Sequence, residues 1–246
     1  MVKSTTEADS LASQIAALTE SGRMVEAFAI LAPVLAERTS FRLLDRIGAR
    51  VGEGPLPQTN AFLTSIARDK PMGGWPLIGS ALAAQLAGDL EGALDRSRAF
   101  IISGDVWYAA DTLAERVPGV ALVTDFQRTL PILVDWRSDS NRWVRKSAGV
   151  AIHLWAKRSS GEERHLPKVR KLLAFLAPMF YEQDLNAVKG IGWALKTLGR
   201  YYPDVVTPWL VQRLTRRRAY RPLMLRKATT YLSTAARNRV HRATFR

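Results

Sequence analysis

The chain has 246 residues, of which 36 are Lys or Arg and 22 are Asp or Glu, so its formal net charge is +14. Hydrophobic residues make up 47% of the sequence, which is typical of a folded chain and excludes a wholly disordered one. With no cysteine and only three histidines, the sequence excludes disulfides, iron–sulfur clusters and cysteine nucleophiles, and we expect neither a metal site nor another cofactor.

The charge is unevenly distributed along the chain. Residues 1–136 contain 12 basic and 16 acidic side chains, whereas residues 137–246 contain 24 basic and 6 acidic ones. A half this basic indicates a polyanionic partner, with nucleic acid as the first candidate and an anionic membrane as the second. No apolar run approaches the ~20 residues of a membrane span, and the first residues lack the apolar stretch of a secretory signal. We therefore expect a cytoplasmic protein that spans no membrane and has no obligatory protein partner. With DNA as the polyanion, it would be nucleoid-associated and would have no membrane partner.

Helical periodicity recurs along almost the whole chain, and strand-like alternation is rare. The predicted helices span residues 7–20, 23–38, 40–52, 56–69, 75–87, 89–103, 106–117, 120–137, 141–158, 166–179, 184–201, 204–215 and 220–236. Turn signals such as Pro118-Gly119 separate them. Asp89, Asp105 and Asp184 are the predicted N-caps of the helices that follow them.

The number and length of these helices predict an all-α fold. Stacked pairs of about 40 residues are the unit of HEAT-like arrays. We expect HEAT-like helical repeats stacked into a curved, right-handed α-solenoid whose basic concave face suits duplex DNA. The array would form a single domain over residues 1–246, with a basic C-terminal tail at about 237–246. A compact helical bundle without repeats is the alternative.

The predicted helix at 106–117 carries the first candidate chemistry. Trp107, Asp111 and Glu115 are spaced at i, i+4 and i+8, so they share one stripe of the helix. An aromatic ring beside a carboxylate can pack against a flat or sugar-like group and present negative charge to it. A partly buried tryptophan, with an aspartate paired to a neighbouring arginine, would give the same pattern.

The predicted helix at 141–158 is strongly basic. Its candidate phosphate-binding side chains are Arg142, Arg145, Lys146, Lys157 and Arg158. Gly149 costs about 1 kcal/mol relative to alanine in mid-helix, which indicates that another helix or a ligand approaches closely there. His153 is interpreted as a packed side chain rather than a catalytic one.

The predicted helix at 184–201 combines lysines with a tryptophan. Lys189 and Trp193 are four residues apart on one face, and Lys196 lies nearby. Gly190 and Gly192 again indicate close packing. A core tryptophan with surface lysines explains this pattern as well as a binding surface does. The arginine-rich stretch that follows would add salt-dependent affinity for a polyanion without reading its sequence.

Three stretches taken in order carry a family resemblance: WYAAD at 107–111, NRWVRK at 141–146 and KGIGWALK at 189–196. Over about residues 100–210 the chain resembles the alkylpurine DNA glycosylases built from HEAT-like repeats, the AlkD family. The resemblance implies a monofunctional glycosylase that hydrolyses the N-glycosidic bond of cationic N3- or N7-alkylated purines in double-stranded DNA, including bulky adducts. Its role would be base excision repair or self-resistance to a DNA-alkylating natural product.

The resemblance also implies roles for particular residues. Asp111 would stabilise the oxocarbenium-like sugar and position water, while Trp107 and Trp193 pack on the nucleotide. Arg145 or Lys146 would contact the DNA backbone near the lesion, and the sequence leaves the choice between them open. The other predicted DNA-binding side chains are Arg142, Lys157, Arg158, Lys189 and Lys196. Gly149 departs from the family's pattern.

Two other interpretations remain open. The first is a non-catalytic helical-repeat protein that binds DNA or acts as a scaffold. Asp111 separates it from a glycosylase, since a relative without the carboxylate would be expected to bind DNA without cutting it. The second is a peripheral membrane or RNA-binding module, which would bind anionic lipid or RNA at least as well as duplex DNA.

Overall fold

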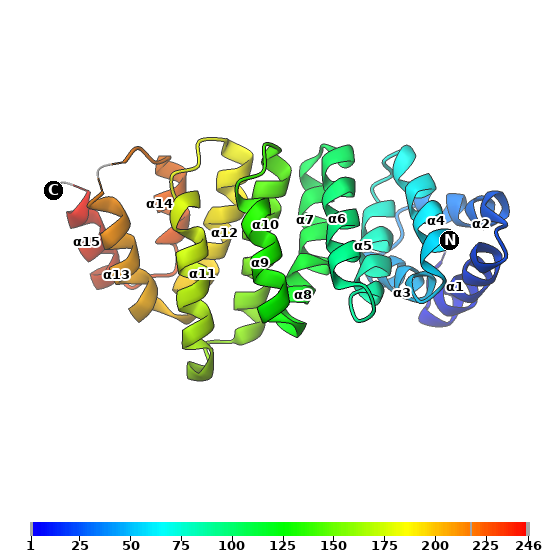
Figure 1. Cartoon of the computed structure of the whole chain (residues 1–246), viewed down its shortest axis with the longest axis horizontal. Coiled ribbons are helices and arrows are strands. Elements are labelled where there is room, and N and C mark those ends of the chain that lie inside the picture. Colours follow the sequence, from blue (N-terminus) through cyan, green and yellow to red (C-terminus); the bar gives the residue numbers. More distant parts are fainter. Residues whose placement is uncertain (1, 217, 245–246) are drawn as a thin grey trace. The chain divides into compact units, whose positions relative to one another are not determined.

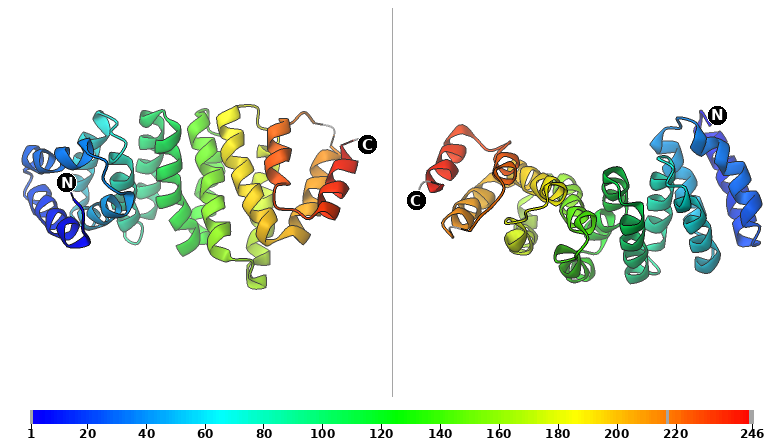
Figure 2. Two further views of the ribbon diagram at one scale, coloured as in Figure 1. Left: turned by 180° about the vertical axis from the view of Figure 1, so that it is seen from behind. Right: turned by 90° about the horizontal axis from the view of Figure 1, so that it is seen from above.

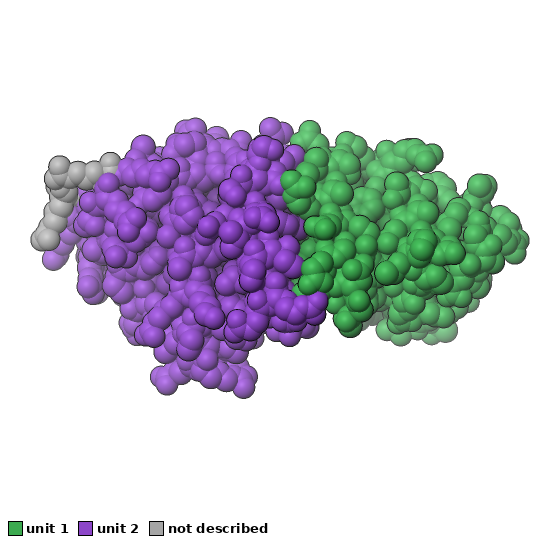
Figure 3. Space-filling view, viewed as in Figure 1, with its two compact units in different colours: residues 1–121 green, residues 122–246 purple. Residues whose placement is uncertain are grey.

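The computed structural model describes residues 2–216 and 218–244, and every regular element within these ranges is a helix. The predicted all-α fold class is therefore confirmed. The chain divides into two compact units, residues 1–121 (unit 1) and residues 122–246 (unit 2), shown in Figure 3. None of the helices in the described ranges is both long and apolar enough to traverse a bilayer.

Unit 1 consists of two rows of helices (Figure 1). One row contains α1 (Thr5–Glu20), α3 (Phe41–Gly52), α5 (Gly74–Gln85) and α7 (Trp107–Arg116), each packed against the next. The other row contains α2 (Met24–Ala36), α4 (Leu56–Arg68) and α6 (Leu90–Gly104). Fully buried apolar side chains such as Ile47, Phe62 and Leu77 fill the core between the rows. The helix α8 (Pro118–Thr124) follows α7 in the chain and spans the boundary between the units.

Unit 2 repeats this arrangement (Figures 1 and 2). One row contains α10 (Arg142–Ser159), α12 (Leu185–Tyr201) and α14 (Pro222–Ala228), with α12 packed against both neighbours. The other contains α9 (Phe126–Arg137), α11 (Leu166–Met179), α13 (Pro203–Leu214) and α15 (Thr234–Ala243). A short 3-10 helix, η1 (Glu163–His165), precedes α11.

Consecutive helices of each unit supply one member to each row, as in α9–α10, α11–α12 and α13–α14. This alternation is the architecture of helical repeats, in which each pair buries its apolar face on the next pair. The predicted repeat organisation is therefore confirmed at the level of helix pairs. The curvature, handedness and basic concave face of the expected solenoid, and its single domain, stay predictions.

Two boundary predictions near the middle of the chain were wrong. The segment predicted as one helix over 120–137 is two helices, α8 and α9. Asp125 separates them, because its side chain accepts a hydrogen bond from the Arg128 N–H at 3.2 Å and caps α9. Pro118, predicted as part of a turn, is instead the first residue of α8, since its fixed φ suits a helix start.

Further corrections concern Asp105 and the C-terminus. Asp105 adopts a left-handed conformation (φ 48°) and ends α6, so Val106 is the residue before α7 and the predicted N-cap was wrong. Asp89 and Asp184 do cap their helices. The predicted helix at 220–236 is two helices, because Ser233 caps α15. Residues 237–243 of the predicted tail are therefore helical, and residues 245–246 lie outside the described residues.

Candidate functional site

The predicted site residues are divided between the two units. Trp107 and Asp111 lie on α7 of unit 1, whereas Trp193 and every predicted DNA-binding residue lie on α10 or α12 of unit 2. Each group is described below within its own unit. Within the described residues, no three His, Asp or Glu side chains come together as a metal site would require.

In unit 1, local backbone geometry sets where α7 begins. Gly104 ends α6 in close contact with the Trp75 ring, and a Cβ added there would lie 3.0 Å from that ring. Val106 is extended, and Trp107 is the first helical residue. Because α7 buries Ala109, Ala110 and Leu113, its opposite side carries Trp107 and Asp111.

The two predicted catalytic residues of unit 1 share that side of α7. Trp107 is 59% exposed and makes an edge-to-face contact with Tyr108, with ring centroids 5.8 Å apart. Asp111 follows one helical turn later and is half-buried. This order places an accessible aromatic surface directly beside a carboxylate, as the i, i+4 spacing predicted.

In unit 2, the helix α10 begins at the N-cap Asn141, whose side chain accepts a hydrogen bond from the Trp143 N–H at 2.8 Å. Trp143 is buried and lies beneath two cations. The Arg142 guanidinium and the Lys146 ammonium are 5.0 and 5.5 Å from its ring centroid, within range of cation–π attraction. Lys146 is only 4% exposed, so its stem is part of the packed interior.

The close packing predicted at the glycines is confirmed. A Cβ added to Gly149 would lie 2.5 Å from the backbone carbon of Gly190, and one added to Gly190 would lie 2.4 Å from the Lys146 carbonyl oxygen. Backbone therefore meets backbone between α10 and α12. A side chain at either position would push the helices apart, because real Cβ contacts essentially never fall below 3.0 Å.

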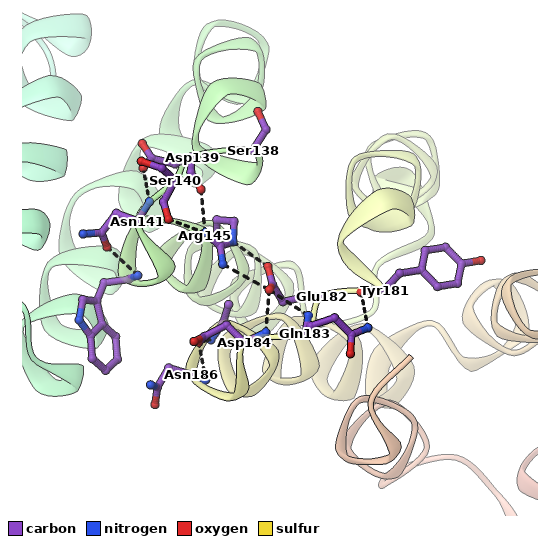
Figure 4. A network of polar contacts seen from close by, with 12 residues as sticks. Ser138, Asp139, Ser140, Asn141, Arg145, Tyr181, Glu182, Gln183, Asp184 and Asn186 are labelled. Carbon is purple, nitrogen blue, oxygen red and sulfur yellow. Dashed lines mark hydrogen bonds and ion pairs between the residues drawn. The ribbon is translucent and has the colours of Figure 1, made fainter. Parts of the chain in front are cut away.

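The Arg145 guanidinium forms hydrogen bonds to other groups of unit 2 (Figure 4). Its Nε donates to Glu182 Oε2 at 2.7 Å, and its Nη1 donates to the carbonyl oxygens of Asp139 and Ser140. Glu182 Oε1 in turn accepts from the Asp184 N–H at 2.8 Å. Arg145 thus ties the loop before α10 to the loop before α12.

The pKa shifts of Arg145 and Glu182 support the role of Arg145 as a link within unit 2. Burial alone would raise the pKa of Glu182, but the hydrogen bonds from Arg145 and from the Asp184 N–H outweigh it and lower that pKa. The hydrogen bond to Glu182 raises the pKa of Arg145, so the pair is ionised. Both side chains are mostly buried, with 18% and 13% exposed.

The structure places the three predicted site residues of α12 on one side of the helix. Lys189 is exposed, and Trp193 and Lys196 are half-buried on the same side of the helix. The His153 ring of α10 stacks on Trp193, with centroids 4.5 Å apart and planes at 11°. Burial, with help from Lys157 and Lys196, lowers the pKa of His153 to about 4, so the imidazole is neutral at pH 7.

A hydrogen-bond chain orients His153. The Thr197 hydroxyl donates to the Trp193 carbonyl oxygen at 3.0 Å and lies 2.7 Å from His153 Nδ1. Because that hydroxyl's one proton is committed, it accepts a hydrogen bond from a protonated Nδ1. His153 therefore packs against a predicted active-site residue, which agrees with its interpretation as a packed side chain.

The structure separates other predicted DNA-binding residues. Arg142 lies in the first turn of α10, whereas Lys157 and Arg158 lie in its last turn, and all three are exposed. With a rise of 1.5 Å per residue, the two ends are about 22 Å apart. They therefore cannot contact the same phosphate.

Sequence reasoning did not single out Lys227 of α14 as a site residue. Its stem lies against Gly192, where an added Cβ would be 2.7 Å from Lys227 Cδ. Burial and then the positive charges of Lys196, Lys189, Arg226 and Lys146 lower its pKa. Three helices thus gather cations around Lys227. Only Gly192 signals this contact in the sequence, and it does not identify the partner.

Within each unit, paired rows of helices define a helical-repeat protein, and in unit 2 cations and aromatic rings lie along the row α10–α12–α14. A family model described as DNA alkylation repair enzyme matches residues 75–232, which include every predicted site residue. The chain belongs to this family. Searches of curated proteins and of solved structures found no match.

Membership has two direct consequences. The chain is an enzyme of DNA alkylation repair, and its partner is DNA. The matched segment extends from α5 to the residues after α14, so it takes in parts of both units.

Proposed function

We propose that the protein is a monofunctional DNA glycosylase that removes purines alkylated at N3 or N7 from double-stranded DNA. The observation that carries the proposal is the placement of Asp111 one turn after the exposed Trp107, on a helix inside the matched segment. The range of substrates would include bulky adducts, in base excision repair or in self-resistance to a DNA-alkylating natural product.

The proposed reaction suits a carboxylate. An N3- or N7-alkylated purine is cationic, so it leaves as a neutral base without an added proton. The bond between C1′ and the purine nitrogen breaks, positive charge develops on the sugar, and the oxygen of a water molecule bonds to C1′. Asp111 would stabilise the positive charge and orient the water, which afterwards loses a proton to solvent.

The predicted aromatic residues would contact the DNA, each from its own unit. Trp107 would pack on the sugar, and its ring face would attract the cationic nucleotide by roughly 0.5–2 kcal/mol. In unit 2, Trp193 would present a ring to the DNA, and the stacked His153 would fix the orientation of that ring. The exposed side chains Arg142, Lys157, Arg158 and Lys189, together with Lys196, would bind the DNA backbone.

The structure bears on the choice between Arg145 and Lys146. The Arg145 guanidinium already has three partners inside unit 2, so we propose that it positions α10 and α12 and does not grip DNA. Lys146 would then be the one of the two that contacts the DNA backbone, through the ammonium beside Trp143, although its stem is packed in the interior of unit 2.

The test is base release from duplex oligonucleotides that carry one N7-methylguanine, one 3-methyladenine or one bulky N3-alkyladenine. Wild type should release the base. Asp111→Asn should be slower by roughly 100- to 1000-fold, because losing one preorganised group that stabilises charge costs about that much. Its affinity for DNA should stay near that of wild type, since no phosphate contact is removed.

The matched control is Asp95→Asn, the same change at an exposed position of α6 in the same unit. It should release base at the wild-type rate. Normal excision by Asp111→Asn would overturn the catalytic assignment. Tight, salt-sensitive DNA binding without release from any substrate would instead favour a non-catalytic DNA-binding protein. The ranking of the three lesions would separate general repair from self-resistance.

A further inference from the structure

The second row of unit 2 contains a basic groove away from the predicted site helices. One side is the face of α11 that carries Arg170 and Ala177. The other is the face of α13 that carries Trp209 and Arg213, continued by Arg216 in the turn after α13. The groove has a volume of about 500 Å³. It combines an apolar surface with three arginines, which is the composition expected for an anion that carries a flat apolar group.

Arg213 is the unusual member of this groove. It is 6% exposed, yet arginine is almost never buried without a carboxylate partner. Its Nη2 donates to Gln212 Oε1 at 2.9 Å, whereas its buried Nε makes no hydrogen bond within the described part of the chain. Burial and the charge of Arg216 lower the pKa of the Arg213 guanidinium.

The other two arginines of the groove add further positive charge. Arg170 and Arg216 are exposed and line the same groove. Across residues 2–216 and 218–244, no carboxylate forms an ion pair with any of the three arginines. Holding like charges together costs free energy, and an anion in the groove would recover it.

Trp209 supplies the flat surface. The Arg213 guanidinium lies 5.6 Å from its ring centroid, and Phe180 supports the ring edge-on at 5.8 Å. The tryptophan is half-buried and lines the groove, so part of its surface is accessible from the groove. A ring held beside arginines is suited to stack a nucleobase while the arginines bind its phosphate.

We propose that the groove between α11 and α13 binds a nucleoside phosphate, with the phosphate on Arg170, Arg213 and Arg216 and the base against Trp209. This site is separate from the residues proposed for base excision, and its occupancy does not depend on glycosylase activity.

The test is calorimetric titration of the full chain with AMP and with inorganic phosphate, paired with thermal unfolding. At ten times its Kd, AMP should raise Tm by roughly 3–6 °C over potassium chloride at equal ionic strength. The double variant Arg170→Ala/Arg216→Ala should weaken AMP binding at least tenfold. Both positions are exposed, so the fold should be retained.

Two further variants sharpen the result. Lys171→Ala, the matched control, removes an exposed charge next to Arg170 and outside the groove, and it should leave the Kd unchanged. Trp209→Leu should bring AMP binding down to that of inorganic phosphate. Asp111→Asn should bind AMP like wild type, whatever its effect on base release.

Three outcomes would overturn the proposal. The first is a Tm shift no larger than that produced by chloride, and the second is an equal loss of binding in Lys171→Ala. The third is binding that depends on Arg170 and Arg216 with duplex DNA but not with AMP, which would identify a second DNA surface instead.

Discussion

Units 1 and 2 share an architecture and differ in charge. Both stack helices in two rows, and both bring backbones into direct contact at glycines, α3 on α5 in unit 1 and α10 on α12 in unit 2. Unit 1 carries 11 basic and 14 acidic residues, whereas unit 2 carries 25 basic and 8 acidic ones. Helix packing therefore does not require the basic charge, which agrees with the DNA contacts proposed for unit 2.

The largest expected effect tests the shared packing. Gly149→Ala should destabilise unit 2 by about 3 kcal/mol or more, because its Cβ would overlap the Gly190 backbone. Gly48→Ala should do the same to unit 1, where the Cβ would lie 2.2 Å from the Leu77 carbonyl oxygen. Denaturant unfolding measures both changes.

Gly88→Ala is the control for both glycine variants, since no atom lies within 4 Å of its added Cβ. It should change the free energy of unfolding by less than about 1 kcal/mol. If Gly149→Ala matched this control while Gly48→Ala did not, the two units would not share one packing rule.

The next effect concerns a network specific to unit 2. Glu182→Gln should cost about 2 kcal/mol of stability, because it leaves the mostly buried Arg145 without its counter-charge. Urea unfolding measures the loss. Glu163→Gln, at an exposed position of η1, should stay within about 0.5 kcal/mol of wild type. Equal effects from the two changes would remove the positioning role assigned to Arg145.

A smaller effect should appear as pH dependence. The folded state keeps His153 neutral down to about pH 4, whereas the unfolded chain protonates it near its ordinary pKa of 6.5. Protonation therefore favours unfolding between these values, and stability falls as pH drops from 6.5 toward 4. The contribution should be roughly 1–2 kcal/mol, less than the full shift implies because solvent reaches part of the ring.

His153→Gln should remove this contribution while keeping a group that can hydrogen-bond Thr197. Thermal unfolding of both proteins from pH 4 to 7.5 gives the comparison. Curves that stay parallel over the whole range would show that folding leaves the pKa of His153 unchanged.

The smallest effect is on DNA binding. Lys189→Ala should lower the slope of log K against log salt by about 0.9, the value for one lost phosphate contact. Arg68→Ala, an exposed cation of α4 in unit 1, should leave the slope unchanged. Fluorescence anisotropy with duplex DNA at several salt concentrations measures both. A matching fall for Arg68 would assign DNA binding to unit 1 as well.

Much of this architecture could be predicted from the sequence. Periodicity located most of the helices, and Asp89 and Asp184 marked two helix starts correctly. The i, i+4 spacing of Trp107 and Asp111 placed them on one helix face, and Gly149 indicated a close approach. These features depend on local spacing or on a residue whose main property is its small size.

Other features depend on partners distant in the sequence. The Arg145–Glu182 pair joins residues 37 positions apart, and His153 stacks on a ring 40 positions further along. A basic residue in a basic helix does not reveal that a single carboxylate neutralises it. Arg213 belongs to the arginine-rich stretch that follows the helix predicted at 184–201, and nothing in that stretch marks it as buried. Its burial follows from how α13 packs and not from its neighbours in the chain.

The contact between Gly149 and Gly190 also limits how this enzyme family member could evolve. Peptide groups, rather than side chains, set the spacing between α10 and α12. No side chain at this contact can therefore be made smaller to bring the helices closer or change their spacing gradually. Substitutions at either glycine could not widen this contact by small steps. With the Trp193 ring presented to the DNA as proposed, inherited variation in substrate size should instead concentrate at that ring and at the supporting His153.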